Sequence, residues 1–243
     1  MLYTLSNIGF ISLSIICIYI IFRILNRTDI SYKTGHDRLT RWFLPGIIIW
    51  IGLVTVLSLT GFTSDFSNFP PRMFLVLLVP LGFVIWALNS TAITQLLKII
   101  PPQWLFYIQG FRFIVEILLW MLYLDQLVPI QMTFEGRNYD ILIGITGPIV
   151  GYLCFTNQRF FKKIGLIWNF AGLVVLMNIL FIAVLSMPSP MRLFMNEPAN
   201  TIVATFPTIL LPAILVPIAY SMHLFSIKQL INMSEPKRIH PVA

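Results

Sequence analysis

The chain has 243 residues, of which 58% are hydrophobic and only 10% are charged, and its formal net charge is +7. Soluble domains carry about 25% charged residues, so this composition excludes a sizeable soluble domain and predicts an integral membrane protein. The basic residues fall in alternate loops between apolar stretches, which indicates membrane topology rather than a surface for nucleic acid. Cys17 and Cys154 lie inside apolar stretches, and we expect them to be packing residues.

Seven apolar stretches are each near the length that a bilayer core requires. They predict an all-α fold, a polytopic transmembrane helix bundle of seven spans that forms one domain over residues 1–243. The first stretch is too long for a cleaved signal peptide and ends in Arg23, so we expect it to remain as a spanning helix. The predicted spans cover about residues 4–25, 42–62, 73–93, 104–124, 141–155, 165–187 and 201–227.

The basic residues also predict the orientation of the chain. Twelve Lys and Arg residues fall in the first, third and fifth loops and the C-terminal tail, whereas the other loops hold only Arg72, Arg137 and Arg192. Because basic loops stay in the cytoplasm, we expect the N-terminus outside and the C-terminus in the cytoplasm. The first cytoplasmic loop, residues 26–41, is the longest polar segment, and its basic balance suits anionic lipid headgroups. We therefore expect membrane lipids as partners and no nucleic acid, and the oligomeric state stays open.

The last three spans carry local signals of their own. The fifth, residues 141–155, would be about 22 Å long, less than a bilayer core of about 30 Å. Either it extends into "TNQRFF", or the preceding loop "MTFEGRNYD" lies below the outer surface. Gly147 and Gly151 give this span a small face that lets another helix approach closely. In the seventh span, Pro207, Pro212 and Pro217 predict a kinked or locally unwound helix.

The fourth span places charges at the middle of the membrane. At 100° per residue, a single stripe about 80° wide contains Gln109, Arg112, Glu116, Trp120 and Tyr123. Charges near the bilayer centre cost several kcal/mol, about 2.5 to 3.5 each or more, unless they are paired or face a polar interior. We expect Arg112 and Glu116 to face the interior and to bond to each other or to a shared polar neighbour.

Further polar side chains lie at comparable depth and are possible partners for the guanidinium: Asn89, Asn169, Asn178 and His223. His223 by itself fits a residue near a helix end at the membrane interface. Two interpretations stay open, a structural ion pair that fixes the helix register, and a ligand-binding or proton-relay site. The residues assigned to the second are Gln109, Arg112, Glu116, Trp120, Tyr123 and Asn178.

The loop before the fifth span, "PIQMTFEGRNYD", is rich in charge. Glu135, Arg137, Asn138 and Asp140 fall within six residues, and we expect them to form an ordered outer cap over the bundle. Asn138 or Asp140 can also cap the following helix. Two acidic residues with one Arg could also form a weak cation site, but their spacing is not diagnostic of one. No catalytic or cofactor-binding motif is recognisable, and we expect no metal and no cofactor.

The segments "QGFRFIVEILLW" and "MTFEGRNYDILIGITGPIVGY" together resemble a family of uncharacterised bacterial polytopic membrane proteins. The resemblance lies within residues 101 to about 155. It implies a multi-pass protein of the plasma membrane, the bacterial inner membrane, and implies no activity.

Three functions are open at this point. The first is binding or transport of a polar or anionic small molecule or a proton at the fourth span. The second is an intramembrane enzyme for a lipid or isoprenoid, with Glu116 or Glu135 as acid or base and Arg112 holding a phosphate. The third is a structural or assembly role without a ligand.

Overall fold

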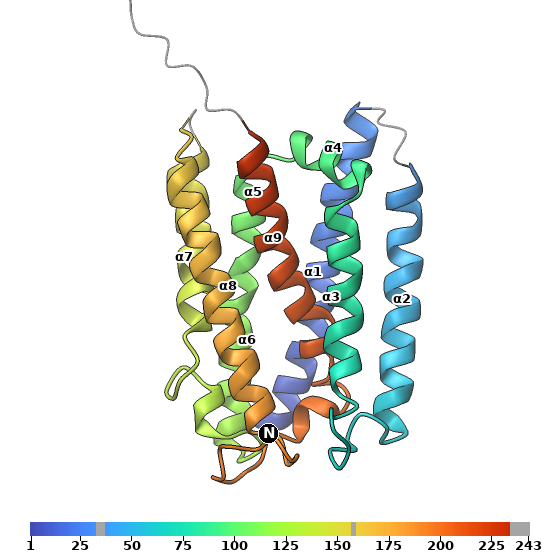
Figure 1. Cartoon of the computed structure of the whole chain (residues 1–243), viewed down its shortest axis with the longest axis vertical. Helices are drawn as coiled ribbons and strands as arrows, with labels where there is room; N and C mark the ends of the chain where they lie inside the picture. Colours follow the sequence, from blue (N-terminus) through green and yellow to red (C-terminus); the bar gives the residue numbers. More distant parts are fainter. Residues whose placement is uncertain (33–36, 157–158, 234–243) are drawn as a thin grey trace, which may run out of the picture.

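The computed structural model describes residues 1–32, 37–156 and 159–233, and the regular secondary structure in this part of the chain consists of helices, without strands. Figure 1 shows the helices side by side in one bundle. The α-helices are α1 (Leu2–Tyr32), α2 (Asp37–Leu59), α3 (Phe74–Leu88), α4 (Thr91–Ile99), α5 (Gln103–Tyr107), α6 (Phe111–Leu124), α7 (Asp140–Phe155), α8 (Lys162–Leu185) and α9 (Val216–Asn232).

Among the described residues, five helical segments are long and apolar enough to cross a membrane: Leu2–Arg27, Arg41–Leu59, Gln103–Leu124, Lys162–Leu185 and Leu211–Asn232. The outward faces of these helices carry many exposed large hydrophobic side chains, such as Ile48, Ile167 and Val174, which suit a lipid environment. The chain is therefore a membrane-embedded helical protein. The number of seven spans stays a prediction, because the third apolar stretch is bent and α7 has only 16 residues. The orientation of the chain in the membrane also stays a prediction.

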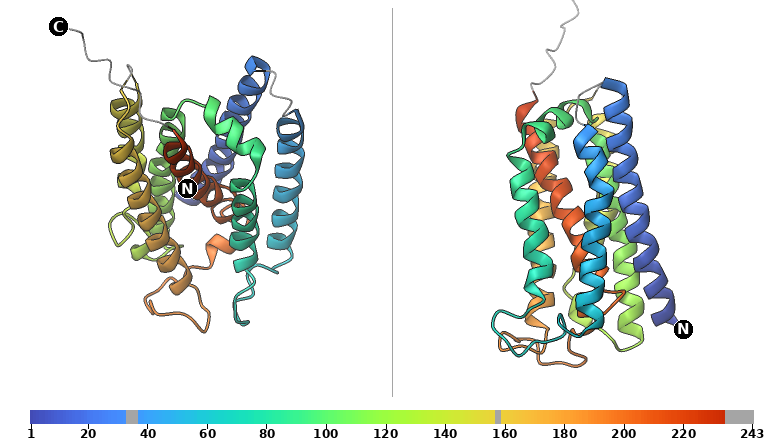
Figure 2. Two further views of the ribbon diagram at one scale, coloured as in Figure 1. Left: turned by 45° about the horizontal axis from the view of Figure 1, so that its top comes forward. Right: turned by 90° about the vertical axis from the view of Figure 1, so that its right-hand side faces the viewer.

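The helices are not equally enclosed. The α6 and α9 segments are mostly buried, whereas α2 is mostly exposed, and α9 runs obliquely through the middle of the bundle (Figure 1 and Figure 2). Helix α9 packs against α8 and α3, and α6 packs between α1 and α7. The core that positions polar groups is thus formed by α6, α7, α8 and α9.

The predicted span 73–93 is wrong at its C-terminal end. Helix α3 ends at Leu88, and α4 continues after a bend of 77°, so that it lies across the end of the bundle (Figure 1). Ser90 has an extended backbone, and α4 buries Ile93, Leu96 and Leu97 while Lys98 is exposed. An amphipathic helix of this kind gains more by lying flat over the bundle end than by continuing the span.

The predicted unwinding of the last span is confirmed, but its predicted start at residue 201 is wrong. A 3₁₀ turn at Ile202–Ala204 and irregular backbone precede a π-helix, Leu211–Leu215, that leads into α9. Pro217 has no N–H for the carbonyl of Ala213, and the indole Nε1 of Trp50 donates to that carbonyl instead, at 3.0 Å. Ser58 and Thr63 donate to the carbonyl of Ala204. Side chains thereby satisfy backbone groups that the prolines and the turn leave free.

The short α7 is confirmed, because the helix ends at Phe155 and the backbone of Thr156 is extended. The predicted close helix contact at its glycine face is confirmed, and the structure shows that the partner is the α5–α6 segment. A Cβ at Gly147 would lie 3.0 Å from the carbonyl oxygen of Phe106, and a Cβ at Gly151 would lie 2.8 Å from the Cβ of Phe106. A Cβ at Gly144 would overlap the backbone of Phe113. Gly144, one turn after the start of α7, therefore lies level with Phe113, and the first residue of the helix, Asp140, is already buried in the bundle.

The first polar loop is shorter than predicted. Helix α1 continues to Tyr32 and α2 begins at Asp37, so most of residues 26–41 is helical and only 33–36 fall outside the described residues.

Candidate functional site: a buried polar chain across the bundle

Arg112 and Glu116 of α6 are both 1% exposed and face the bundle interior. Of the two predicted arrangements, direct bonding between Arg112 and Glu116 is not found, and the two side chains are instead linked through Asp140 and Asn138. The Nε of Arg112 donates to Oδ2 of Asp140 at 2.7 Å, and its Nη2 donates to Oδ1 of the same carboxylate. Asp140 is the first residue of α7, which packs against α6. A carboxylate that arrives from a facing helix can meet the planar guanidinium fork with both oxygens, whereas Glu116 lies one turn away on the same helix in the less favoured order.

The third bond of Arg112 joins it to α9. Its Nη1 lies 2.8 Å from Nε2 of His223. Because a guanidinium only donates, Nε2 of His223 must accept this hydrogen bond, and the imidazole therefore carries its proton on Nδ1. Nδ1 lies 2.9 Å from Oδ1 of Asn169, and the Asn169 amide donates to Oγ of Ser226 at 2.9 Å. The geometry therefore assigns a neutral His223 that links Arg112 to α8 and α9.

The expectation that His223 lies near a helix end at the interface is wrong, because it is fully buried. Helix α9 extends to Asn232 and carries His223 well inside the bundle. Gly172 of α8 makes room for the ring, since a Cβ there would overlap the imidazole. A glycine opposite a histidine is a signal that one sequence does not reveal, because it depends on which helices are neighbours.

Glu116 is held from the loop before α7. Its Oε1 accepts from Nδ2 of Asn138 at 2.5 Å, and Oε2 is buried without a partner among the described residues. The same amide of Asn138 also donates to the carbonyl of Met132, and its Oδ1 accepts from the backbone N–H of Asp140 at 3.0 Å. Asn138 thus connects Glu116 to the Arg112–Asp140 pair. We call the resulting series of hydrogen-bonded residues the polar chain: Glu116, Asn138, Asp140, Arg112, His223, Asn169 and Ser226.

The polar chain does not balance its charges when both carboxyl groups are ionised. Within it, Arg112 is the single cation, and it is committed to Asp140. His223 is in a neutral tautomer, so an ionised Glu116 would leave one uncompensated negative charge in the bundle. Buried charges require partners, and this imbalance identifies Glu116 as the chemically unusual residue of the site.

The other predicted site residues lie outside the polar chain. Trp120 donates from Nε1 to the exposed Glu135 at 2.9 Å, and Asn178 donates to the backbone carbonyl of Arg137 at 2.8 Å. Both thus attach the outer loop to the helices. Tyr123 is half-buried against the hydrophobic core. Gln109 is buried in the 3₁₀ turn before α6 and donates to the carbonyl of Ala219 at 3.1 Å, away from Arg112.

The predicted outer cap divides into two parts. Asn138 and Asp140 are buried members of the polar chain, whereas Glu135 and Arg137 are exposed. Backbone bonds to the carbonyl of Thr133 and the close approach of Gly136 to Ile130 fix the loop. Sequence reasoning placed Asp140 in the cap and missed it as the partner of Arg112; the short fifth span was the available signal.

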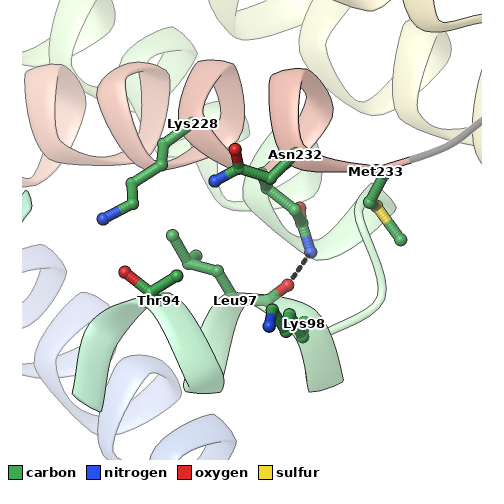
Figure 3. A pocket seen from close by; sticks show the side chains of 7 residues that line it. Thr94, Leu97, Lys98, Lys228, Asn232 and Met233 are labelled. Carbon is green, nitrogen blue, oxygen red and sulfur yellow. Dashed lines mark hydrogen bonds between the residues drawn. The ribbon is translucent and has the colours of Figure 1, made fainter. Parts of the chain in front are cut away.

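Two hollows lie away from the polar chain. One, about 350 Å³, is bounded by the loop before α7 and the loop after α8. The other, about 20 Å³, lies between α4 and the end of α9 beside Lys98 and Lys228 (Figure 3). The second has room for about one water molecule. There the Gln229 amide donates to the carbonyls of Leu97 and Ile100 at the end of α4, an arrangement that holds α4 in place.

In the described ranges, no group of three or more His, Cys, Asp or Glu side chains is placed to hold a metal ion. No family model matches the chain, and no curated protein or solved structure shows significant similarity to it. The polar chain and the two hollows are therefore the features from which a function can be inferred.

Proposed function

We propose that this integral membrane protein carries protons across the membrane and that Glu116 is the residue that binds and releases them. The observation that supports the proposal is the state of the Glu116 carboxyl group. One oxygen accepts from Asn138, the other is buried without a described donor, and the only cation of the polar chain is bound to Asp140. A proton on Oε2 would remove the uncompensated charge, and its release would restore it.

The neighbours of Glu116 fit this role. Asn138 reaches it from the loop before α7, while Arg112 and Asp140 lie on the other side of that amide. His223 is the second titratable side chain that flanks the Arg112–Asp140 pair, and it faces α8 through Asn169. The pair thus lies between two titratable side chains, Glu116 and the neutral His223. Intramembrane ionisable residues commonly form such relays in pumps and transporters.

The same contacts weigh against a ligand held directly by Arg112. Each of the three guanidinium nitrogens already donates to Asp140 or His223. A substrate carboxylate or phosphate would have to displace a buried carboxylate that is bound at two positions, at a cost of several kcal/mol. This also disfavours the intramembrane enzyme in which Arg112 holds a phosphate.

The test is proton flux into vesicles that contain the purified protein and an enclosed pH-sensitive dye. After an external pH jump, the protein should collapse the gradient faster than empty vesicles do. Glu116→Gln should reduce the rate to that of empty vesicles, because an amide keeps the Asn138 contact as an acceptor but holds no exchangeable acid proton. Glu135→Gln is the matched control, since this exposed carboxylate should leave the rate unchanged.

Two results would count against the proposal. The first is wild-type protein that collapses the gradient no faster than empty vesicles. The second is a Glu116→Gln variant that remains folded and conducts as the wild type does.

A structural role is the second candidate, and the Arg112–Asp140 pair favours it. This pair joins α6 to α7, and His223 joins it to α9. The pair could fix the register of three helices without any ligand. In that case, Glu116→Gln would change neither flux nor folding.

A further inference from the structure

The hollow of about 350 Å³ lies away from the polar chain and is a shallow depression that opens to the surface. Its volume falls within the range of about 300 to 1,000 Å³ that is usual for small-molecule sites. It is bounded by the loop before α7 and the loop after α8. Six residues line it: Ile130, Gln131, Gly136, Arg137, Phe194 and Asn196. The lining combines one cation, two amides and two apolar side chains.

Arg137 is the charged group of this hollow. Its guanidinium lies 5.5 Å from the centre of the Phe194 ring, a favourable cation–π arrangement. Three described arginines have carboxylate partners: Arg72 with Asp65 at 3.2 Å, Arg192 with Glu197 at 2.9 Å, and Arg112 with Asp140. Within the described ranges, Arg137 has none. The nearby Glu135 instead accepts from Trp120.

Hydrogen bonds hold the two amide side chains that line the hollow, Gln131 and Asn196, in place. Gln131 is 5% exposed, donates to Oγ of Ser186 at 2.9 Å and accepts from Nδ2 of Asn196 at 2.8 Å. The Asn196 amide has a second N–H for which the structure shows no acceptor in the described residues. Gly136 admits no side chain, because a Cβ there would overlap the Ile130 backbone. The wall is therefore a preformed surface with a donor on it.

We propose that this hollow binds a small organic monoanion, a carboxylate attached to an apolar body. Arg137 would hold the carboxylate with two parallel N–H donors, and the Asn196 amide would add a third. Ile130 and Phe194 would cover the apolar part. A single uncommitted cation matches one negative charge, which favours a monocarboxylate over a phosphate with about two charges.

This inference goes beyond proton transport and stands on different residues. The two sites are nevertheless adjacent along the chain, because Arg137 precedes the Asn138 that holds Glu116. A ligand that moved Arg137 would therefore also shift the adjacent Asn138, which donates to Glu116. Ligand binding can be measured without any flux, so failure of one proposal is distinguishable from failure of the other.

Benzoate is a suitable probe because it is a monocarboxylate with a flat apolar body. Calorimetric titration of benzoate into the detergent-purified full chain should show saturable binding. Arg137→Ala should weaken the affinity at least tenfold, and Arg137→Lys should weaken it less, because a lysine keeps the charge but loses the fork. Arg72→Ala, which removes an exposed arginine with a carboxylate partner, should bind as the wild type does.

Inorganic phosphate and benzyl alcohol complete the design. Phosphate tests for a general oxyanion site, and benzyl alcohol tests for partition of an apolar ring into detergent or protein. Both should bind at least tenfold more weakly than benzoate. Absence of saturable benzoate binding to the wild type, equal binding to Arg137→Ala, or phosphate or benzyl alcohol binding as tight as benzoate would each overturn the proposal.

Discussion

Replacing Arg112 with methionine tests the ion pair that joins α6 to α7. The change keeps an unbranched side chain but removes the two bonds to Asp140 and the bond to His223. Asp140 is 5% exposed, so its carboxylate would be left in the interior without its cation. The perturbation is therefore the loss of a partner from a buried pair, which is more costly than the loss of the pair as a whole.

The expected loss of stability is large. Removing one partner of a buried ion pair typically costs about 3 to 5 kcal/mol. For a chain of 150–250 residues, each kcal/mol moves the melting temperature by about 2–4 °C on the scale of soluble domains, so Arg112→Met should lower it by about 6 to 20 °C. Adding Asp140→Asn removes the stranded charge, and the double variant should recover more than half of that loss.

Thermal unfolding of the detergent-purified protein, followed by tryptophan fluorescence, measures these shifts. Arg72→Met is the matched control, because its bridge to Asp65 is partly exposed and should be worth less than about 1 kcal/mol. If Arg112→Met melted within about 2 °C of Arg72→Met, or if the double variant were no more stable than Arg112→Met, the reasoning about the buried pair would be refuted.

Three further predictions concern other parts of the structure. Gly172→Ala should destabilise the protein by about 1–3 kcal/mol in thermal unfolding because it displaces His223, whereas Gly52→Ala, which meets open space, should not; equal effects would contradict the packing. In a variant with both native cysteines replaced by alanine, Ser67→Cys should react with an impermeant thiol reagent from outside intact cells and Thr91→Cys only after permeabilisation, and the reverse pattern would refute the orientation. Hydrogen bonds from Ser67 lower the pKa of the Asp65 carboxyl. The loop between α2 and α3 should therefore keep its hydrogen-exchange protection at pH values above the usual Asp range and lose it as the pH falls through the lowered pKa. If an Asp65→Asn variant showed the same loss of protection at acidic pH, Asp65 would be excluded as its cause.

Hydrophobic length and residue spacing predicted much of the bundle. The apolar stretches became helices, the prolines of the last span marked its unwound start, and the small face of Gly147 and Gly151 marked a close helix contact. These features depend on neighbours along one chain segment, which a single sequence contains. The break after Leu88 was missed because the apolar run continues through an amphipathic helix that turns aside.

The candidate site was only half predictable. The stripe on the fourth span identified Arg112 and Glu116 as buried, because charged side chains in an apolar helix are tolerated mainly where they face the bundle interior. Their partners depend on which helix faces which. Asp140 reaches Arg112 because α7 begins below the bundle surface, and His223 reaches it because Gly172 leaves space. Neither relation is encoded in the spacing of residues within one segment.

The protonation of Glu116 is the central claim, and infrared difference spectroscopy measures it directly. A proton on the buried carboxyl group gives the carbonyl band of a carboxylic acid, whereas release gives carboxylate bands. Between acidic and alkaline buffer, the wild-type protein should show such a conversion that is absent from Glu116→Gln and present in Glu135→Gln. A difference spectrum for Glu116→Gln that matches the wild type, while the variant remains folded, would contradict proton binding at this residue.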